Sequence, residues 1–105
     1  MNSPVQNKES LINLILSNKN RILDFGVSRL GIFGSFVRNE ANKMSDVDFY
    51  IEFFPEKKTF DNFMDLGFFL EEITGRKIEL VTPQSLSPYI GPHILKEIEY
   101  VPIAA

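Results

Sequence analysis

The segment Asp46–Phe53 alternates between polar and apolar side chains along its whole length. Successive side chains of a β-strand point to opposite faces of the sheet, so this alternation predicts a strand with one face in the core. The apolar face consists of Val47, Phe49, Ile51 and Phe53. Asp46 and Asp48 share the other face. The chain is therefore expected to contain a half-buried strand that carries two carboxylates together.

Helices and strands are expected to alternate along the rest of the chain. Apolar residues at helical spacing predict an amphipathic helix over Glu9–Phe25, with Gly26 at its C-terminal cap. The other expected elements are a strand over Val27–Phe33, a short helix over Phe36–Arg38, a loop over Asn39–Ser45, a helix over Phe60–Ile73 capped by Thr59, a strand over Lys77–Thr82, and, within the proline-rich tail Pro83–Ala105, a short turn and a helix over His93–Ile98 before an irregular end. At 105 residues, 44% of them hydrophobic, the chain has room for one α+β domain over residues 1–105.

Composition excludes several classes of function. A formal net charge of -3 argues against a broad basic surface, so no stable binding of nucleic acid is expected. Cysteine is absent and His93 is the single histidine, so any bound metal must prefer oxygen ligands. No apolar run approaches the roughly 18 residues of a membrane span, and a cytoplasmic location is expected. The basic pair Arg76-Lys77 is interpreted as solvated surface.

A glycine-serine turn precedes the acidic strand by a fixed interval. Ten residues separate Gly34-Ser35 from Asp46-Val47-Asp48. Gly34 lets a backbone approach a phosphate closely, Ser35 offers a hydroxyl donor, and a helix that opens here would direct unpaired N–H groups at an anion. The usual phosphate loops, GxxxxGK[ST] and GxGxxG, are absent. The two motifs together indicate a phosphate site of another design.

The paired carboxylates call for a compensating cation. Two carboxylates about 4 Å apart repel by roughly 4 kcal/mol at an effective dielectric constant near 20. Magnesium is commonly held by one or two protein carboxylates together with substrate phosphates, and it needs neither thiol nor imidazole. Asp46 and Asp48 are therefore candidate ligands for magnesium that is bound with a nucleotide.

These motifs resemble a known family. Gly34-Ser35-Phe36-Val37-Arg38, followed by Ser45-Asp46-Val47-Asp48-Phe49, is similar to the GSx10DxD pattern of the minimal nucleotidyltransferases of the DNA polymerase β superfamily. The similarity continues through Lys77–Thr82 to the tail at His93–Val101, and it covers most of the chain.

The resemblance implies a nucleotidyltransferase fold, with a small mixed β-sheet packed by helices on one side, and a site for ATP. Two Mg²⁺ ions would be held by three catalytic carboxylates, Asp46, Asp48 and Glu79. Glu79 stands where the family usually has aspartate. Arg38 matches an arginine that assists the phosphates beside Gly34 and Ser35.

The resemblance also implies a partner. Small members of this family are similar to antitoxins that transfer AMP from ATP to a tyrosine of a HEPN-domain ribonuclease toxin, which suggests a hetero-oligomer with that toxin. One alternative is an antitoxin with little or no catalytic activity that neutralises the toxin by binding alone. A third reading, nucleotide transfer to a small molecule or an RNA end, is weaker because such relatives generally carry an additional substrate domain.

Overall fold

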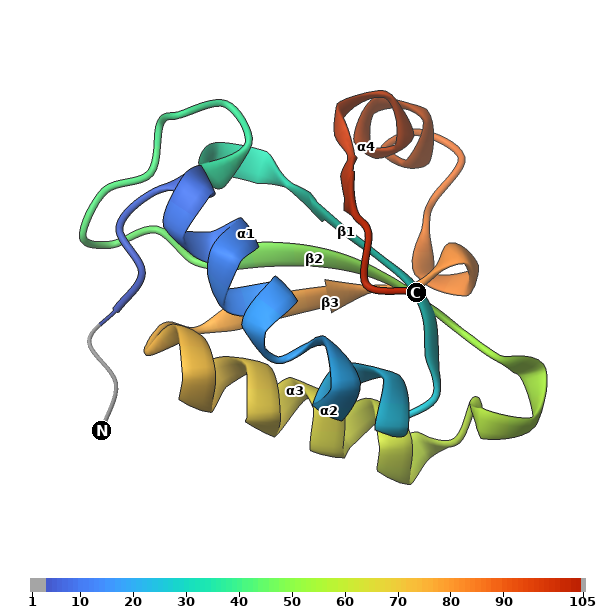
Figure 1. The fold of residues 1–105 in the computed structure, drawn as a ribbon. Helices are drawn as coiled ribbons and strands as arrows, with labels where there is room; N and C mark the ends of the chain where they lie inside the picture. The colour runs from blue at the N-terminus through green and yellow to red at the C-terminus, as the bar shows by residue number, and fades with distance from the viewer. Residues whose placement is uncertain (1–3, 105) are drawn as a thin grey trace.

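The structure, a computed structural model, describes residues 4–104, and a four-stranded mixed sheet lies at its centre (Figure 1). The strands are β1 (Val27–Phe33), β2 (Val47–Phe53), β3 (Ile78–Val81) and β4 (Glu99–Val101). They are arranged in the order β3-β2-β1-β4. β1 pairs antiparallel with both β2 and β4, whereas β2 pairs parallel with β3. This arrangement agrees with the α+β class expected from the sequence.

Three helices cover one face of the sheet: α1 (Lys8–Ser17), α2 (Lys19–Asp24) and α3 (Phe60–Thr74) (Figure 1). Their apolar residues join the inward-facing residues of β1 and β2 in the main hydrophobic core. Thr59 caps α3 as expected, because its hydroxyl accepts a hydrogen bond from the backbone N–H of Asn62. At the other end Gly75 adopts φ +68°, the left-handed conformation that commonly ends a helix. Within residues 4–104 no helix is both long and apolar enough to cross a membrane.

The expected single helix over Glu9–Phe25 is wrong, because the helix breaks at Asn18. The Asn18 side-chain amide donates to the backbone carbonyl of Leu14, and the Asn18 backbone N–H donates to that of Ile15. These bonds satisfy carbonyls at the end of α1, and the chain then turns into α2. Asparagine competes for local backbone hydrogen bonds in this way, which makes it a poor interior helix residue.

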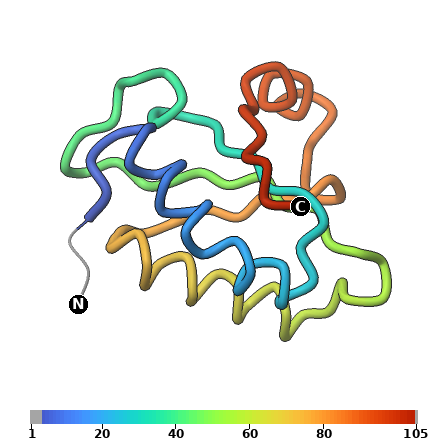
Figure 2. Tube along the Cα trace, viewed as in Figure 1, coloured from blue at the N-terminus to red at the C-terminus, as the bar shows by residue number. Residues whose placement is uncertain are grey.

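The C-terminal tail is more regular than the sequence indicated. After the 3-10 turn Pro83–Ser85, α4 spans Gly91–Glu97 and the chain returns to pair β4 with β1 (Figure 2). The expected irregular end is therefore wrong over Glu99–Val101. A second, smaller apolar cluster, built from Phe33, Tyr50 and Val81 with Leu86, Ile94 and Ile98, joins α4 to the other face of the sheet.

Arg76 fastens the loop that leads into β2. Its Nε donates to the carbonyl of Val5 at 2.7 Å, and its Nη1 donates to the carbonyls of Asn42 and Ser45, each at 2.9 Å. The guanidinium also lies 5.2 Å from the centre of the Phe36 ring. Interpreting Arg76 as solvated surface is therefore wrong. It ties together three segments of the chain immediately before Asp46.

We predict that Arg76→Lys lowers the free energy of unfolding by about 2 kcal/mol, because an ammonium group cannot reproduce the planar fork that reaches three carbonyls. Urea denaturation measures the change. The neighbouring Lys77 is exposed, so Lys77→Ala is the matched control and should stay within about 0.5 kcal/mol of the original protein. Equal losses in the two variants would show that the fork does not fasten the loop.

Candidate active site

The turn after β1 brings the backbone against the acidic strand. Gly34 opens a 3-10 turn, Gly34–Phe36, rather than the expected helix over Phe36–Arg38. It has φ +79°, and a Cβ atom added there would lie 2.1 Å from Oδ2 of Asp48. Any other residue would therefore meet both backbone strain and a direct clash. Glycine at position 34 is what allows the turn to lie against the carboxylate.

Ser35 lies half-buried in the same turn. Its backbone carbonyl accepts a hydrogen bond from the N–H of Glu40 at 2.8 Å, which closes the turn. Over residues 4–104 the Ser35 hydroxyl makes no hydrogen bond with the protein. It therefore remains a donor for an incoming group.

Strand register places the candidate carboxylates side by side. Asp48 is the partner of Phe33 on β1 and of Glu79 on β3. Glu79 is the cross-strand neighbour of Asp48, and the charges of Glu79 and Asp46 both act on the Asp48 carboxylate. Asp48 is half-buried, whereas Asp46 and Glu79 are exposed. The structure thus gathers around Asp48 the three acidic residues selected from the sequence.

The environment of Asp48 favours its protonated form. Burial, followed by the charges of Glu79 and Asp46, raises the pKa of Asp48 to about 6, and the Arg38 guanidinium offsets only part of this rise. A cation at this point would remove the repulsion and compete with the proton. A carboxyl group whose pKa is raised by burial and by neighbouring carboxylates marks a candidate functional site.

The donor set suits a hard divalent cation. All three side chains offer carboxylate oxygens, which are the ligands that magnesium prefers. Within residues 4–104 no three acidic or imidazole groups are already arranged to enclose an ion. Asp48 and Glu79 face each other instead, and the exposed Asp46 carboxylate has room to turn.

Glu97 is a member of the site that sequence reasoning missed. Its carboxylate accepts a hydrogen bond from the backbone N–H of Gly34 and two from Nη1 of Arg38, at 2.9 and 2.7 Å. Nε of Arg38 donates to Glu40 at 2.8 Å. The Arg38 guanidinium, together with the Gly34 N–H, lowers the pKa of Glu97 against the opposing effect of burial. No local motif marks Glu97, because it reaches the turn only through the packing of α4.

The raised pKa of Asp48 gives a prediction about stability. An unfolded aspartate has a pKa near 3.9, so the folded state holds the proton more tightly, and stability falls as the pH rises from about 4 through 6. Asp48→Asn removes this penalty. In metal-free buffer at pH 7.5 it should raise the free energy of unfolding by about 1 kcal/mol, a value reduced for solvent screening of the half-exposed group.

Urea denaturation at pH 7.5 and pH 4 tests the sign. The gain from Asp48→Asn should disappear at pH 4, where the original carboxyl is protonated in the folded state. Asp46→Asn serves as a control, because it removes one charge just before the strand at an exposed position that is less desolvated. A loss of stability in Asp48→Asn at pH 7.5 would contradict the electrostatic account.

Comparisons with known proteins identify the family of the chain. Residues 12–101 match the nucleotidyltransferase domain family. The protein adenylyltransferase MntA of Thermococcus cleftensis is 35% identical over 94 residues, which are 89% of this chain and 94% of the relative.

Solved structures share the fold. A minimal nucleotidyltransferase superposes with a TM-score of 0.68 at 25% identity, over 84% of this chain and 93% of that one. A toxin–antitoxin structure with AMP-PNP matches with a TM-score of 0.62 at 17% identity, over 80% and 72%. A tri-AMPylated Shewanella oneidensis HEPN toxin in complex with its MNT antitoxin matches with a TM-score of 0.54 at 15% identity, over 81% and 69%. The chain therefore belongs to the nucleotidyltransferase domain family, within its group of minimal nucleotidyltransferases.

Proposed function

We propose that this protein is a magnesium-dependent adenylyltransferase that transfers AMP from ATP to a tyrosine hydroxyl of a HEPN-domain ribonuclease toxin and so neutralises it. The observation that carries the proposal is the position of Asp48, which lies against the Gly34 turn and beside Glu79, within electrostatic reach of Asp46. The protein would act in the cytoplasm, in a hetero-oligomer with the toxin. The matched toxin–antitoxin structures, one with AMP-PNP and one with an AMPylated HEPN toxin, support this choice of nucleotide and partner.

Asp46, Asp48 and Glu79 would hold the metal. When bound, two magnesium ions would neutralise charge on the phosphates and on the oxygens that attack and leave. Burial of Asp48 beside two other carboxylates makes the site costly without such ions and ready to accept them. Glutamate at position 79 is one methylene longer than aspartate, and its exposed position gives the longer side chain room to adjust.

Ser35 and Arg38 would bind the leaving phosphates, and Gly34 would let the backbone approach them, although its N–H donates to Glu97 in this structure. The free Ser35 hydroxyl lies on the turn that approaches Asp48. Glu40 and Glu97 hold Nε and Nη1 of Arg38, so Nη2 is the part of the guanidinium that can donate to a phosphate oxygen. The two carboxylates thus orient the arginine without using all of its donors.

Transfer forms one bond and breaks one. The acceptor hydroxyl oxygen bonds to the α-phosphorus of ATP, the bond from that phosphorus to the bridging oxygen breaks, and pyrophosphate leaves with the electron pair. The hydroxyl proton must move to a base, and we assign this role to Glu79. Glu79 is exposed on β3, on the far side of Asp48 from the phosphate-binding turn. It therefore lies where an acceptor from another protein can reach it.

We predict that Asp46→Asn/Asp48→Asn lowers AMP transfer by on the order of 100-fold or more, because the variant loses the charge that positions metal and phosphates. The experiment incubates the protein with a cognate HEPN-domain toxin, ATP and magnesium, and it measures added AMP by intact mass. Chelation of magnesium should also abolish transfer.

Two outcomes would reject the proposal in different ways. Equal AMP addition by the double variant would remove the carboxylates from the mechanism. If no AMP is added by either protein while both still neutralise the toxin, the protein acts by binding alone. AMP transfer to a small molecule or RNA end, with the toxin left unmodified, would favour the third reading.

The contact of Glu97 with Arg38 gives a second prediction. Glu97→Gln preserves the shape and can still accept from Gly34, but it loses the charge that holds the guanidinium. Transfer should fall roughly 10-fold, because the arginine is no longer held in position. Arg38→Ala should fall at least as far, and adding Glu97→Gln to it should cost nothing further. Fully multiplicative effects in this double-mutant cycle would mean that Glu97 does not act through Arg38.

A further inference from the structure

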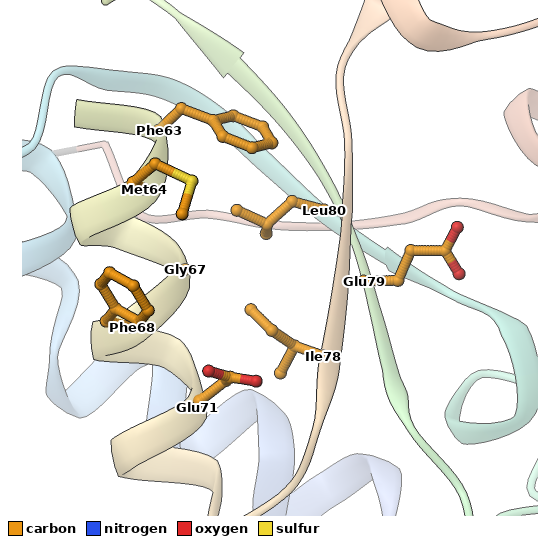
Figure 3. Close-up of a pocket in the computed structure, with 8 residues that line it drawn as sticks. All are labelled: Phe63, Met64, Gly67, Phe68, Glu71, Ile78, Glu79 and Leu80. Carbon is orange, nitrogen blue, oxygen red and sulfur yellow. The ribbon is translucent and has the colours of Figure 1, made fainter. Parts of the chain in front are cut away.

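An apolar groove runs between α3 and the outer strand of the sheet (Figure 3). Its volume is about 370 Å³. The residues that line it are Phe63, Met64, Gly67, Phe68, Glu71, Ile78, Glu79 and Leu80. Phe68 is 60% exposed, although it is aromatic. Gly67 contributes no side chain, and this leaves the groove open between the helix and Leu80.

β3 borders the groove with an unpaired edge. It is the outermost strand of the sheet, and no strand within residues 4–104 lies beyond it. The N–H of Val47 donates to the carbonyl of Lys77 at 3.0 Å. This bond shows which residues of the β3 segment direct their backbone groups toward β2. In such a ladder alternate residues direct their backbone groups to the same side. Ile78 and Leu80 therefore direct their N–H and C=O groups outward, where an extended chain can pair with them.

The two faces of β3 carry side chains that point to different parts of the protein. The side chains of Ile78 and Leu80 point toward α3 and into the groove, whereas the Glu79 carboxylate points to the opposite side of the strand (Figure 3). On that side Glu79 faces Asp48. A chain paired to this edge would place alternate residues in the groove and beside Glu79.

The direction of attack also leads to this edge. In an in-line displacement the attacking and leaving oxygens lie on opposite sides of the phosphorus. The phosphate-binding turn, which holds the leaving group, follows β1, and Asp48 lies on the neighbouring β2. The attacking hydroxyl must then approach from the side of β3. The side of β1 is already occupied by α4, whose Glu97 contacts Gly34 and Arg38.

We propose that the groove between α3 and β3 binds an extended segment of the acceptor protein, which adds to the edge of β3 and presents its tyrosine to Glu79. The inference rests on the proposed transfer of AMP and names the surface that delivers the acceptor. Main-chain bonds to Ile78 and Leu80 supply binding energy, and the groove selects apolar side chains on either side of the tyrosine.

The charge of the groove limits which acceptor segments can bind in it. Neither lysine nor arginine lines the groove, and the Glu71 carboxylate gives it negative charge on the side of α3, whereas the Glu79 carboxylate points to the opposite side of β3. In Figure 3 the Glu71 carboxylate lies at the end of the groove beside Ile78. The occupant that fits is a segment with apolar residues two positions apart and a basic residue near them. An acidic segment would be repelled.

Two variants of the groove test the proposal in opposite ways. Phe68→Asp places a charge in the groove at an exposed position, and Gly67→Leu fills it with an apolar side chain. A Cβ at Gly67 meets Leu80 at 3.5 Å, an ordinary contact, and replacement of a mid-helix glycine favours the helix. Gly67→Leu should therefore fold at least as stably as the original protein.

Both variants should raise the KM for the toxin roughly 10-fold or more, while the Kd for AMP-PNP stays unchanged. Tyr89→Asp is the matched control, because Tyr89 is an aromatic residue that is 85% exposed and lies outside the groove. It should leave the KM for the toxin unchanged. An unchanged KM in both groove variants, or an equal rise in the control, would overturn the proposal.

Hydrogen exchange tests strand addition directly and does not depend on catalysis. Binding of the toxin should slow amide exchange at Ile78 and Leu80 by at least about 10-fold, because these N–H groups become paired. Absence of this protection in a formed complex would overturn the proposal. If protection occurs and the groove variants weaken binding, but no AMP is transferred, then the docking surface stands and the proposed enzymatic function fails.

Discussion

The register of β2 between its two neighbours is the constraint on which the site depends. Asp48 pairs with Phe33 on one side and with Glu79 on the other, so a single residue of β2 sets the distance to both the Gly34-Ser35 turn, the proposed phosphate site, and the Glu79 carboxylate. The turn approaches so closely that only glycine fits at position 34. A slip of one residue in β2 would send Asp48 into the core and Val47 to the site, because side chains alternate between faces. The hydrophobic core that holds this register therefore also holds the chemistry.

Opposite electrostatic conditions exist on the two sides of Asp48. Toward β3, carboxylates repel one another, and the pKa of Asp48 is raised to about 6. Toward β1, Arg38 is already paired with two carboxylates, and the pKa of Glu97 is lowered. The first side lacks positive charge and the second is internally balanced. A cation that arrives with a nucleotide is therefore attracted to the β3 side of Asp48. On the β1 side, the carboxylates hold Arg38 in its orientation before any ligand binds.

Features set by local sequence could be predicted, and features set by distant contacts could not. The period of two along β2 put Asp48 on the face opposite Val47 and Phe49, although the strand begins at Val47 and leaves Asp46 just before it. Thr59 caps its helix as its position indicated. The break at Asn18 was missed because apolar spacing continues across it, while the decisive bonds are made by one side chain. Arg76 donates hydrogen bonds to residues that lie 31 to 71 positions away in the sequence. Glu97 accepts hydrogen bonds from residues that lie 59 to 63 positions away. Contacts over such separations leave no periodic signal in the chain.

The two edges of the sheet have different surroundings. On the side of β1, the short strand β4 forms the edge, and the packing of α4 brings Glu97 to the turn. On the side of β3 the edge remains open beside an apolar groove, a combination that invites unwanted association. Its risk is limited, because β3 has four residues and Glu79 places a charge on it. An edge that is short, charged on one face and apolar on the other favours a specific extended partner over indiscriminate pairing, and it lies where the proposed in-line transfer requires the acceptor.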